Sequence, residues 1–302
     1  MQPVNLIAIV GPTASGKTRL AARLARETGS EVISADSRQV YRGLDIGSGK
    51  DLGDYVVDGV PVPCHLIDVA DPREEFSVFT YQKAFRACFT ELSRRGLVPV
   101  LAGGTGLYIE AVLRDFRMEE VPENPELRRE LRDRSVEELA GLLRSANPRL
   151  HNTSDLGDRA RLLRAIEIAR HRADVPAEPG PALRPLVVGV RWERAVLRRR
   201  ISERLEVRLA GGLVEEVRRL LDSGVSQERL HELGLEYRYI GLYLKGDLAY
   251  DAMVRTLSIR IGQFAKRQET WFRGMERRGV PIRWIEGGDY EALRNLAKAA
   301  MS

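Results

Sequence analysis

Short apolar runs alternate with helical patterns along the first third of the chain. Val4–Val10 is a β-branched apolar run typical of a buried strand, and apolar residues recur at helical spacing in Lys17–Glu27. Further strands are predicted at Glu31–Ser34, Leu66–Val69 and Val98–Leu101. A helix between the last two has its apolar positions at Tyr81, Phe85, Cys88, Phe89 and Leu92. Because strands alternate with helices, the pattern predicts a parallel α/β sheet.

The pattern changes in the middle of the chain. In residues 114–173 the strand signals vanish and three helical pieces appear, one of them preceded by the capping-box pair Ser135 and Glu138. The proline-rich stretch Val175–Pro185 then leads into one more strand, Leu186–Val190, and a wholly helical remainder. We therefore predict a helical insertion at residues 114–173 within an α/β core formed by residues 1–113 and 174–302.

The composition is that of a globular protein. Of the 302 residues, 43% are hydrophobic and 30% are charged, which excludes wholesale disorder and the compositions of collagen and coiled coils. The apolar run Leu6–Val10 is too short to span a bilayer or to act as an export signal. Cys64 and Cys88 cannot build a disulfide framework or a thiolate zinc site, and we interpret both as core residues. We expect a cytoplasmic protein.

The positive charge is unevenly distributed. The formal net charge is +5, yet residues 1–190 hold 26 Lys and Arg against 27 Asp and Glu, whereas residues 191–302 hold 22 against 16. Only six of the 48 cations are Lys. Because Arg is the better planar partner for phosphate, an anionic partner such as a nucleic acid is one interpretation. A genomic bias toward Arg explains the composition equally well.

The most specific motif is a phosphate loop. Gly11–Thr18 reads G-P-T-A-S-G-K-T, fits G-x-x-x-x-G-K-[ST], and lies between a predicted strand and a predicted helix, as the motif requires. Glycines let the backbone wrap a di- or triphosphate, amides at the helix N-terminus donate to its oxygens, Lys17 adds a positive charge, and Thr18 can bind Mg²⁺. The alternative is a chance glycine-rich turn. The candidate phosphate-binding residues are Gly11, Pro12, Thr13, Ala14, Ser15, Gly16, Lys17 and Thr18.

Two more candidates follow other predicted strands. Asp36 comes after the second strand, and because the carboxyl ends of parallel strands converge on one crevice, we expect it beside the phosphate loop. The alternatives are that Asp36 caps its own loop or binds the Mg²⁺ of an ordinary NTPase. Gly103–Tyr108 follows a third strand. Its three glycines indicate a close backbone approach, and Thr105 can direct a hydroxyl into the same crevice.

Five segments, in order along nearly the whole chain, resemble one family. They are the phosphate loop, D-S-R-Q-V-Y-R-G-L-D-I-G at Asp36–Gly47, His65–Asp68, Gly103–Tyr108 and Ala265–Trp271. Together they resemble the tRNA dimethylallyltransferases, also called tRNA isopentenyltransferases or the IPP transferase family. The resemblance implies a P-loop NTPase-like sheet and transfer of a dimethylallyl group from dimethylallyl diphosphate to N6 of the adenosine just 3′ of the tRNA anticodon. The products are N6-dimethylallyladenosine and diphosphate.

The chemistry of this transfer fits the candidate residues. Departure of the diphosphate requires neutralisation of its developing charge, which Lys17, the loop amides and Mg²⁺ on Thr18 can supply. The resemblance assigns Asp36 as the general base that takes the proton from N6, with Thr105 orienting the amine. The predicted catalytic residues are therefore Asp36, Thr105 and Lys17.

A long C-terminal helix, about Asp251–Arg273, carries two further candidates. Its apolar face is predicted to hold Met253, Leu257, Phe264 and Trp271, with Arg255, Lys266 and Arg273 opposite. Arg260 and Arg267 fall on the edge of the apolar face, seven residues apart, and are predicted to point inward. They would bind the diphosphate or form internal salt bridges. The resemblance adds Arg238 as a weaker candidate for the diphosphate.

The resemblance also assigns contacts with tRNA. They are Asp36, Ser37, Arg38, Gln39, Thr105, Arg128, Ala160, Arg161, Leu162, Leu163 and Arg164. On charge alone, each arginine of the insertion fits a solvated helix face better than a phosphate contact. The insertion is expected to bind the anticodon loop of tRNA. We expect the enzyme to be a monomer. The four histidines lack the spacing of metal ligands, and Mg²⁺ is the expected cofactor.

The sequence departs from the family pattern in three places. Ser48–Asp51 stands where the family usually has Thr-Ala-Lys-Pro, and the following Leu52–Pro63 is unfamiliar. Cys64 stands where the family frequently has a His, and Gly262 stands where it commonly has an Arg. We expect Arg260 to take over the role of that missing Arg. We expect these departures to affect the fine geometry of substrate binding and the acceptor more than the fold.

Three other functions share some of these features. A small-molecule P-loop kinase would bind ATP and carry a short Arg-rich lid in place of the 60-residue insertion. A relative that prenylates free adenine nucleotides would share the donor site, but the insertion favours a macromolecular acceptor. An NTP-gated RNA-binding module would share the loop and the basic C-terminal third, but it would give Asp36 no proton to accept.

Overall fold

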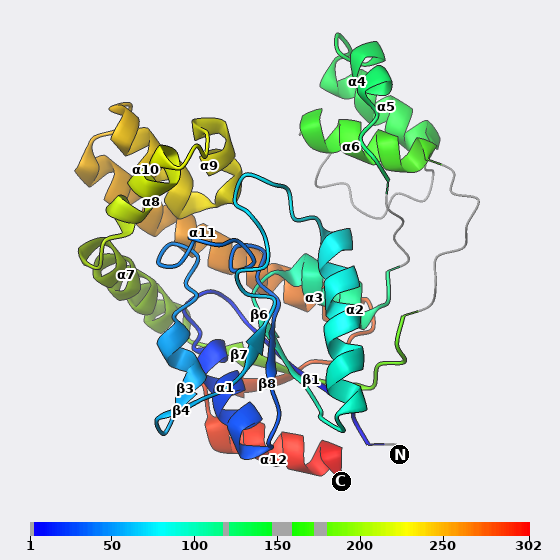
Figure 1. Cartoon of the computed structure of the whole chain (residues 1–302), viewed down its shortest axis with the longest axis vertical. Coiled ribbons are helices and arrows are strands. Elements are labelled where there is room, and N and C mark those ends of the chain that lie inside the picture. The colour runs from blue at the N-terminus through cyan, green and yellow to red at the C-terminus, as the bar shows by residue number, and fades with distance from the viewer. Residues whose placement is uncertain (1–2, 117–120, 147–158, 172–179) are drawn as a thin grey trace. The chain divides into compact units, whose positions relative to one another are not determined.

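The computed structural model describes residues 3–116, 121–146, 159–171 and 180–302. The chain forms two compact units, one from residues 1–116 and 180–302 and the other from residues 117–179 (Figure 1). The smaller unit therefore begins three residues later and ends six residues later than the predicted insertion, residues 114–173.

A six-stranded sheet with parallel pairing throughout forms the centre of the larger unit. Its order is β5 (Cys64–His65), β2 (Val32–Ser34), β6 (Val100–Gly103), β1 (Leu6–Val10), β7 (Pro185–Arg191) and β8 (Arg283–Glu286). The central strand β1 is fully buried, as its apolar run predicts. The parallel α/β sheet predicted from the alternation of strands and helices is confirmed.

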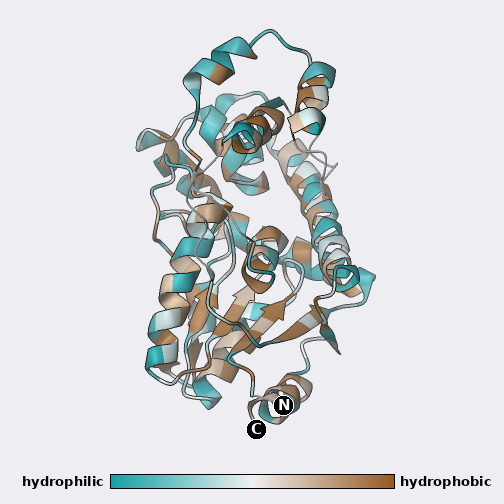
Figure 2. Cartoon of the chain, turned by 90° about the vertical axis from the view of Figure 1, so that its right-hand side faces the viewer, coloured by the Kyte–Doolittle hydropathy of each residue, from teal (hydrophilic) through white to brown (hydrophobic). Residues whose placement is uncertain are grey.

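Helices cover both faces of this sheet (Figure 2). The residues of β1 alternate between the two cores that these helices form with the sheet. Leu6, Ala8 and Val10 pack with α2 (Val78–Arg94), α3 (Gly106–Leu113) and α11 (Tyr250–Arg277). Ile7 and Ile9 pack with α1 (Lys17–Glu27) and α12 (Tyr290–Met301). This alternation is the two-residue period of a strand buried on both faces.

A third core lies among α7 (Arg194–Ala210), α8 (Leu213–Asp222), α9 (Gln227–Leu233), α10 (Leu235–Lys245) and part of α11. Residues of the loop that follows β2, including Tyr41 and Leu44, pack into it. That loop leads to a short 3₁₀ helix, η1 (Leu52–Tyr55), and a two-stranded hairpin of β3 (Val56–Val57) and β4 (Val60–Pro61). The helical core therefore supports a loop that begins at the end of a sheet strand.

Two strand predictions were wrong. The strand expected at Leu66–Val69 is β5, two residues earlier, because Leu66 and Asp68 adopt positive φ angles of 61° and 56° that do not fit a strand. The remainder after residue 190 is not wholly helical, because β8 pairs with β7 at the edge of the sheet. In β8 the apolar residues are Trp284 and Ile285 alone, so it carries a weak signal in the sequence.

The smaller unit has three helices among its described residues and its own small core. They are α4 (Pro125–Glu130), α5 (Val136–Ala146) and α6 (Arg159–Arg170). Leucines 127, 131, 139, 143 and 162 are buried together with Ile166. The predicted capping box is confirmed, since the Ser135 amide donates to Glu138 Oε2 at 2.7 Å and the Glu138 amide donates to Ser135 Oγ at 3.2 Å.

Candidate active site

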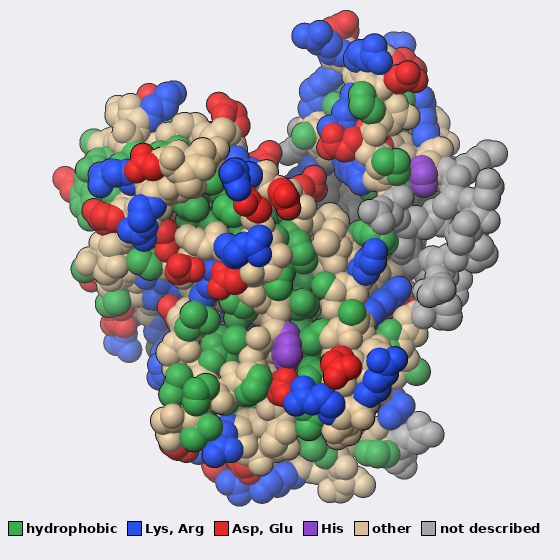
Figure 3. All heavy atoms as spheres, in the orientation of Figure 1, with side chains coloured by type: hydrophobic (Ala, Val, Ile, Leu, Met, Phe, Trp, Pro, Cys, Tyr) green, Lys and Arg blue, Asp and Glu red, His purple; other side chains and the backbone are tan. Residues whose placement is uncertain are grey.

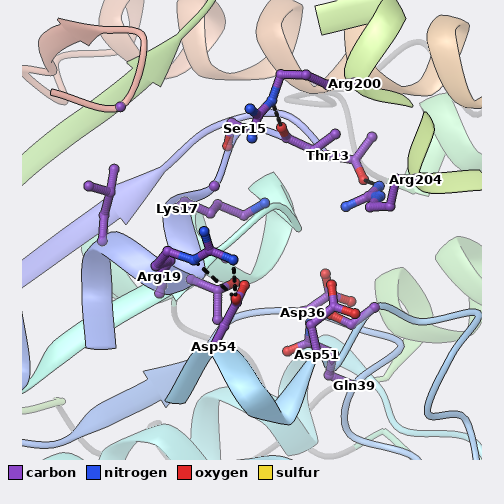
Figure 4. Close-up of a pocket in the computed structure, with 18 of the residues that line it drawn as sticks. Thr13, Ser15, Lys17, Arg19, Asp36, Gln39, Asp51, Asp54, Arg200 and Arg204 are labelled. Atoms are coloured by element: carbon purple, nitrogen blue, oxygen red, sulfur yellow. Dashed lines mark hydrogen bonds and ion pairs between the residues drawn. The ribbon is translucent and has the colours of Figure 1, made fainter. Parts of the chain in front are cut away.

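Three loops at the carboxyl ends of neighbouring strands surround one cavity of about 930 Å³. The phosphate loop follows β1, Asp36 lies just beyond β2, and Gly103 ends β6. Lys17 and Asp36 both line this cavity, so the predicted position of Asp36 beside the phosphate loop is confirmed (Figure 4). The arrangement is the ligand crevice expected of a parallel α/β sheet.

The phosphate loop has the backbone conformation of an anion cradle. Ala14 and Gly16 have positive φ angles of 62° and 84°, and α1 begins directly afterwards at Lys17. Successive residues of this kind turn their amides toward one point, at the positive end of the helix. Ser15 Oγ is buried and has no hydrogen-bond partner among the described residues. Thr13, Ala14, Ser15, Gly16, Lys17 and Thr18 line the cavity, whereas Gly11 and Pro12 are buried behind it.

Two arginines of α7 donate hydrogen bonds to the phosphate loop. Arg200 Nε donates to the Ala14 carbonyl oxygen at 2.8 Å, and Arg204 Nη2 donates to Thr13 Oγ1. Both side chains line the cavity. They were not among the predicted site residues, although their four-residue spacing beside the buried Leu197 and Ile201 is a signal that one face of the helix turns them inward.

Three cations of this cavity lack carboxylate partners, whereas Arg19 pairs with Asp54 at 3.0 Å. Lys17, Arg200 and Arg204 form no ion pair within 4 Å in the described part of the chain; Lys17 Nζ instead donates to the Pro12 carbonyl oxygen at 3.2 Å. Burial, with a contribution from Arg204, lowers the pKa of Lys17 to about 8 although Asp36 opposes the change. Burial and the neighbouring Arg208 likewise lower the pKa of Arg204 to about 10. Such crowding is relieved when an anion binds.

A tight turn holds Asp36 at the cavity. Its Oδ1 accepts the Arg38 amide at 2.9 Å, and Thr105 Oγ1 accepts the Ser37 amide at 2.9 Å. Asp36 Oδ2 has no hydrogen-bond partner among the described residues. One oxygen therefore caps the loop, as the alternative interpretation proposed, while the other is available for chemistry. Thr105 holds this turn and does not line the cavity.

Gln268 on α11 links two of the loops. Its Oε1 accepts the Thr13 amide at 2.8 Å, and its Nε2 donates to the Gly104 carbonyl oxygen at 2.8 Å. Gly103 has no room for a side chain, because a Cβ atom there would lie 2.1 Å from the Ala35 carbonyl oxygen. The predicted close backbone approach at the glycine turn is thus confirmed. Sequence reasoning missed Gln268 as a site residue, although Gln268 stands in the Ala265–Trp271 segment that resembles the family.

The predicted inward orientation of Arg260 and Arg267 is wrong. Both side chains are exposed and outside the cavity lining; Arg260 Nη1 donates to Gln263 Oε1 at 3.2 Å, and the Arg267 guanidinium lies 5.8 Å from the Phe264 ring centroid. The buried stripe of α11 contains Met253, Leu257, Ile261, Ala265, Gln268, Phe272 and Met275. This stripe leaves the predicted apolar Phe264 exposed as well. Arg238 is also exposed, and its Nη2 donates to the His231 carbonyl oxygen.

The predicted tRNA-contacting residues divide into several groups. Ser37, Arg38 and Gln39 lie in the turn after β2, where buried Gln39 also lines the cavity. In the insertion, Ala160 and Arg161 are exposed, and Leu163 is partly buried. Leu162 is 1% exposed in the core of the insertion, so a direct RNA contact of its side chain is contradicted.

Arg128 and Arg164 of the insertion are already paired with a carboxylate. Arg128 Nε lies 2.7 Å from Glu167 Oε1, and Arg164 Nη1 lies 3.0 Å from Glu167 Oε2. Glu167 is buried and also accepts the Asn124 amide at 3.0 Å. On the face drawn in Figure 3, basic side chains lie along the helices of the insertion with acidic ones interspersed.

No group of three or more His, Cys, Asp or Glu side chains that could hold a metal ion occurs in the described residues. Within the same residues, no helix is long and apolar enough to cross a membrane. Thr18, the predicted Mg²⁺ ligand, lines the cavity together with Asp36.

Comparisons with known proteins agree on one family. The model of the IPP transferase family matches residues 39–275, and that of the isopentenyl transferases matches residues 4–58. The chain is 58% identical over 297 residues to tRNA dimethylallyltransferase 1 of Syntrophus aciditrophicus, covering 97% of each protein. It is 56% identical over 286 residues to tRNA dimethylallyltransferase 2 of Pelobacter propionicus, covering 94% of this chain and 90% of the relative.

Solved structures show the same likeness. The tRNA isopentenylpyrophosphate transferase of Bacillus halodurans matches with a TM-score of 0.71 at 32% identity, covering 98% of this chain and 96% of that one. A eukaryotic dimethylallyltransferase acting on tRNA matches with a TM-score of 0.78, covering 97% of this chain and 76% of that one. Its identity is 20%, so this match bears on the fold alone.

Proposed function

The chain belongs to the IPP transferase family, and we propose on that premise that it is a tRNA dimethylallyltransferase. It transfers the dimethylallyl group of dimethylallyl diphosphate to N6 of the adenosine 3′ to the tRNA anticodon. The observation that carries the proposal is a group of cations in the same cavity as Asp36, namely Lys17, Arg200 and Arg204, which have no carboxylate partner among the described residues. A diphosphate supplies the missing anion, and the acceptor amine supplies a proton for Asp36.

The phosphate loop acts as the holder of the leaving group. As the bond between C1 of the prenyl group and the diphosphate oxygen breaks, negative charge grows on the diphosphate. Lys17, the loop amides and the α7 arginines are already fixed around the cavity, so they stabilise this charge without reorganising. Ser15 Oγ, which is buried and has no hydrogen-bond partner in the described part of the chain, is a further donor for a diphosphate oxygen.

Asp36 accepts the proton that the new bond displaces. N6 of adenine forms a bond to C1 of the prenyl group and loses one proton, which moves to Asp36 Oδ2. The turn that Thr105 holds fixes the carboxylate, because Oδ1 is engaged by the Arg38 amide. Thr105 therefore acts by positioning Asp36 rather than by the predicted contact with the amine, since it does not line the cavity.

Mg²⁺ fits this site as a partner of the diphosphate. Mg²⁺ is usually bound through one or two protein oxygens together with substrate phosphates, and the Thr18 hydroxyl lines the cavity beside Asp36. When bound, the ion neutralises charge on the diphosphate. Thr18 would hold it, and the phosphate loop would keep the diphosphate oxygens in place.

The insertion, residues 117–179, is proposed to bind the anticodon loop. A stacked adenosine must leave its stack before a crevice at the strand ends can receive it, so an additional surface must hold the RNA. Exposed Arg161 on α6 and the basic side chains along these helices support this role. Arg128 and Arg164 contribute indirectly, because Arg128 holds α4 to Glu167 of α6 and Arg164 pairs with Glu167 within α6.

One assay tests the proposed activity against its alternatives. Purified protein is mixed with labelled dimethylallyl diphosphate and either unmodified tRNA or AMP, and transfer is followed by chromatography of the nucleosides. We expect label in tRNA, dependent on Mg²⁺, and none in AMP. Label in AMP alone would identify a free-nucleotide prenyltransferase, and ATP turnover without prenyl transfer would identify a kinase.

A further inference from the structure

One wall of the donor cavity is built from the segment that departs from the family pattern. Ser48, Gly49, Asp51, Leu52, Gly53 and Asp54 line the cavity. In Figure 4, Asp51 lies beside Asp36 and Gln39, apart from the cations of the phosphate loop and α7. Asp51, whose side chain is 48% exposed, therefore places a carboxylate at a site proposed to bind an anion. An unpaired carboxylate there would oppose the binding of a diphosphate.

A buried arginine of α7 pairs with that carboxylate. Arg208 Nη2 lies 3.1 Å from Asp51 Oδ2, while the Arg208 residue is only 7% exposed. Arg208 comes one turn after Arg204 on the same helix; it lies behind the wall of the cavity and does not line it. Its Nε has no hydrogen-bond partner among the described residues, and Asp51 is the carboxylate with which it forms an ion pair there; Glu236 also interacts electrostatically with Arg208.

The backbone of the departing segment is shaped for this arginine. Gly49 has a φ of 70°, and a Cβ atom there would lie 2.2 Å from Arg208 Nη2. Asp51 has a φ of 40°, in the left-handed region that non-glycine residues rarely adopt. A side chain at position 49 would meet the Arg208 guanidinium, and a proline at position 51 could not adopt this φ angle, so Gly49, Asp51 and Arg208 form one interdependent unit.

We propose that Arg208 is a positioning residue of the donor site: by pairing with Asp51 it keeps that carboxylate at the wall and leaves Lys17, Arg200 and Arg204 for the donor diphosphate. The inference rests on the proposed function, because it concerns the same cavity. Without Arg208, the Asp51 carboxylate would compete with the diphosphate for the cations. Removing Asp51 as well should then restore donor binding, which a purely structural role of Arg208 does not predict.

The test is a double-mutant cycle read as donor KM and kcat at saturating tRNA. We expect Arg208→Met to raise the donor KM about tenfold while kcat changes less than about threefold, as for the loss of an ion pair beside a charged ligand. Asp51→Asn alone should leave the donor KM unchanged or lower it. The double variant should return to within about threefold of wild type. Arg198→Met, on the exposed side of the same helix, is the matched control and should behave as wild type.

A second variant separates charge from packing. Arg208→Lys keeps the positive charge, so its donor KM should stay within about threefold of wild type. The role of Arg208 would be overturned by a double variant that is as impaired as Arg208→Met. An Arg208→Lys variant as impaired as Arg208→Met would overturn it as well. A rise in donor KM in Asp51→Asn equal to that in Arg208→Met would overturn it too, because Asp51 would then assist the donor. A wild-type protein that transfers no prenyl group to tRNA would instead overturn the proposed function, and this role with it.

Discussion

Arginines and lysines serve opposite purposes in the donor cavity and in the helical insertion. In the insertion, Arg128 and Arg164 converge on one buried carboxylate, Glu167. In the cavity, Lys17 and Arg204 face open space and have no carboxylate partner among the described residues. The first group completes its own electrostatics and holds helices together, whereas the second is completed only by a ligand.

The ionisation of the central groups follows this contrast. Burial raises the pKa of Glu167, but hydrogen bonds from Arg128, from the Asn124 amide and from Arg164 outweigh it and hold the pKa below its usual range. For Lys17 the balance is reversed, because burial and Arg204 outweigh the attraction of Asp36 and lower the pKa to about 8. In this chain, a buried cation therefore indicates a ligand site where the described residues supply no counter-charge to it.

The largest expected effect lies in the cavity. Asp36→Asn keeps the shape of the side chain and its acceptance of the Arg38 amide but removes the base. We expect turnover to fall by about 10² to 10⁴-fold, with donor and tRNA affinities little changed. Single-turnover kinetics with labelled donor measure the step directly. Unchanged turnover would remove Asp36 from the chemistry.

A second effect should be confined to the insertion. Glu167→Gln leaves two partly exposed arginines without their shared carboxylate, and we expect a loss of about 2 kcal/mol in the stability of this unit. Amide exchange of α4 and α6 measures it, and donor affinity should not change. Because the folded-state pKa is lowered, the wild-type contribution is present above the usual value of 4.5 and is lost as pH falls through the folded pKa. A loss of donor binding in Glu167→Gln would contradict the separation of roles.

The smallest effect is expected for the exposed arginines of α11. Replacing Arg260 and Arg267 together by Met should change the donor KM by less than about threefold, because neither side chain lines the cavity. The matched variant on α7, Arg204→Met, should raise the donor KM at least about tenfold. Equal effects of the two variants would show that the arginines of α11, not α7, serve the donor.

The sequence predicted the parts of the site that depend on local pattern. The phosphate loop, Asp36 and the glycine turn each follow a strand, and the geometry of a parallel sheet brings strand ends together whatever the other details. The insertion was predictable because its helical periodicity interrupts the alternation of strands and helices. The position of β5 was not, since positive φ angles at Leu66 and Asp68 override a local apolar run.

The remaining site residues depend on packing between distant segments. Arg200 and Arg204 reach the phosphate loop because the apolar stripe of α7 orients them, and Gln268 does so because α11 is buried along a different stripe from the one predicted. Likewise, the pairing of Arg128 with Glu167 depends on how α4 meets α6. Charge and spacing alone give the same signal for a paired arginine and for one that awaits a ligand.

The most direct test of the central claim, that the cavity cations await the donor diphosphate, is proton uptake on binding. Dimethylallyl diphosphate is titrated calorimetrically at pH 8 in buffers of different ionisation enthalpy. Because burial lowers the pKa of Lys17 to about 8, part of this amine is neutral before binding, and the diphosphate should charge it. We predict that wild type takes up more protons on binding than Lys17→Ala does. Binding by wild type with no more proton uptake than in Lys17→Ala would contradict the claim.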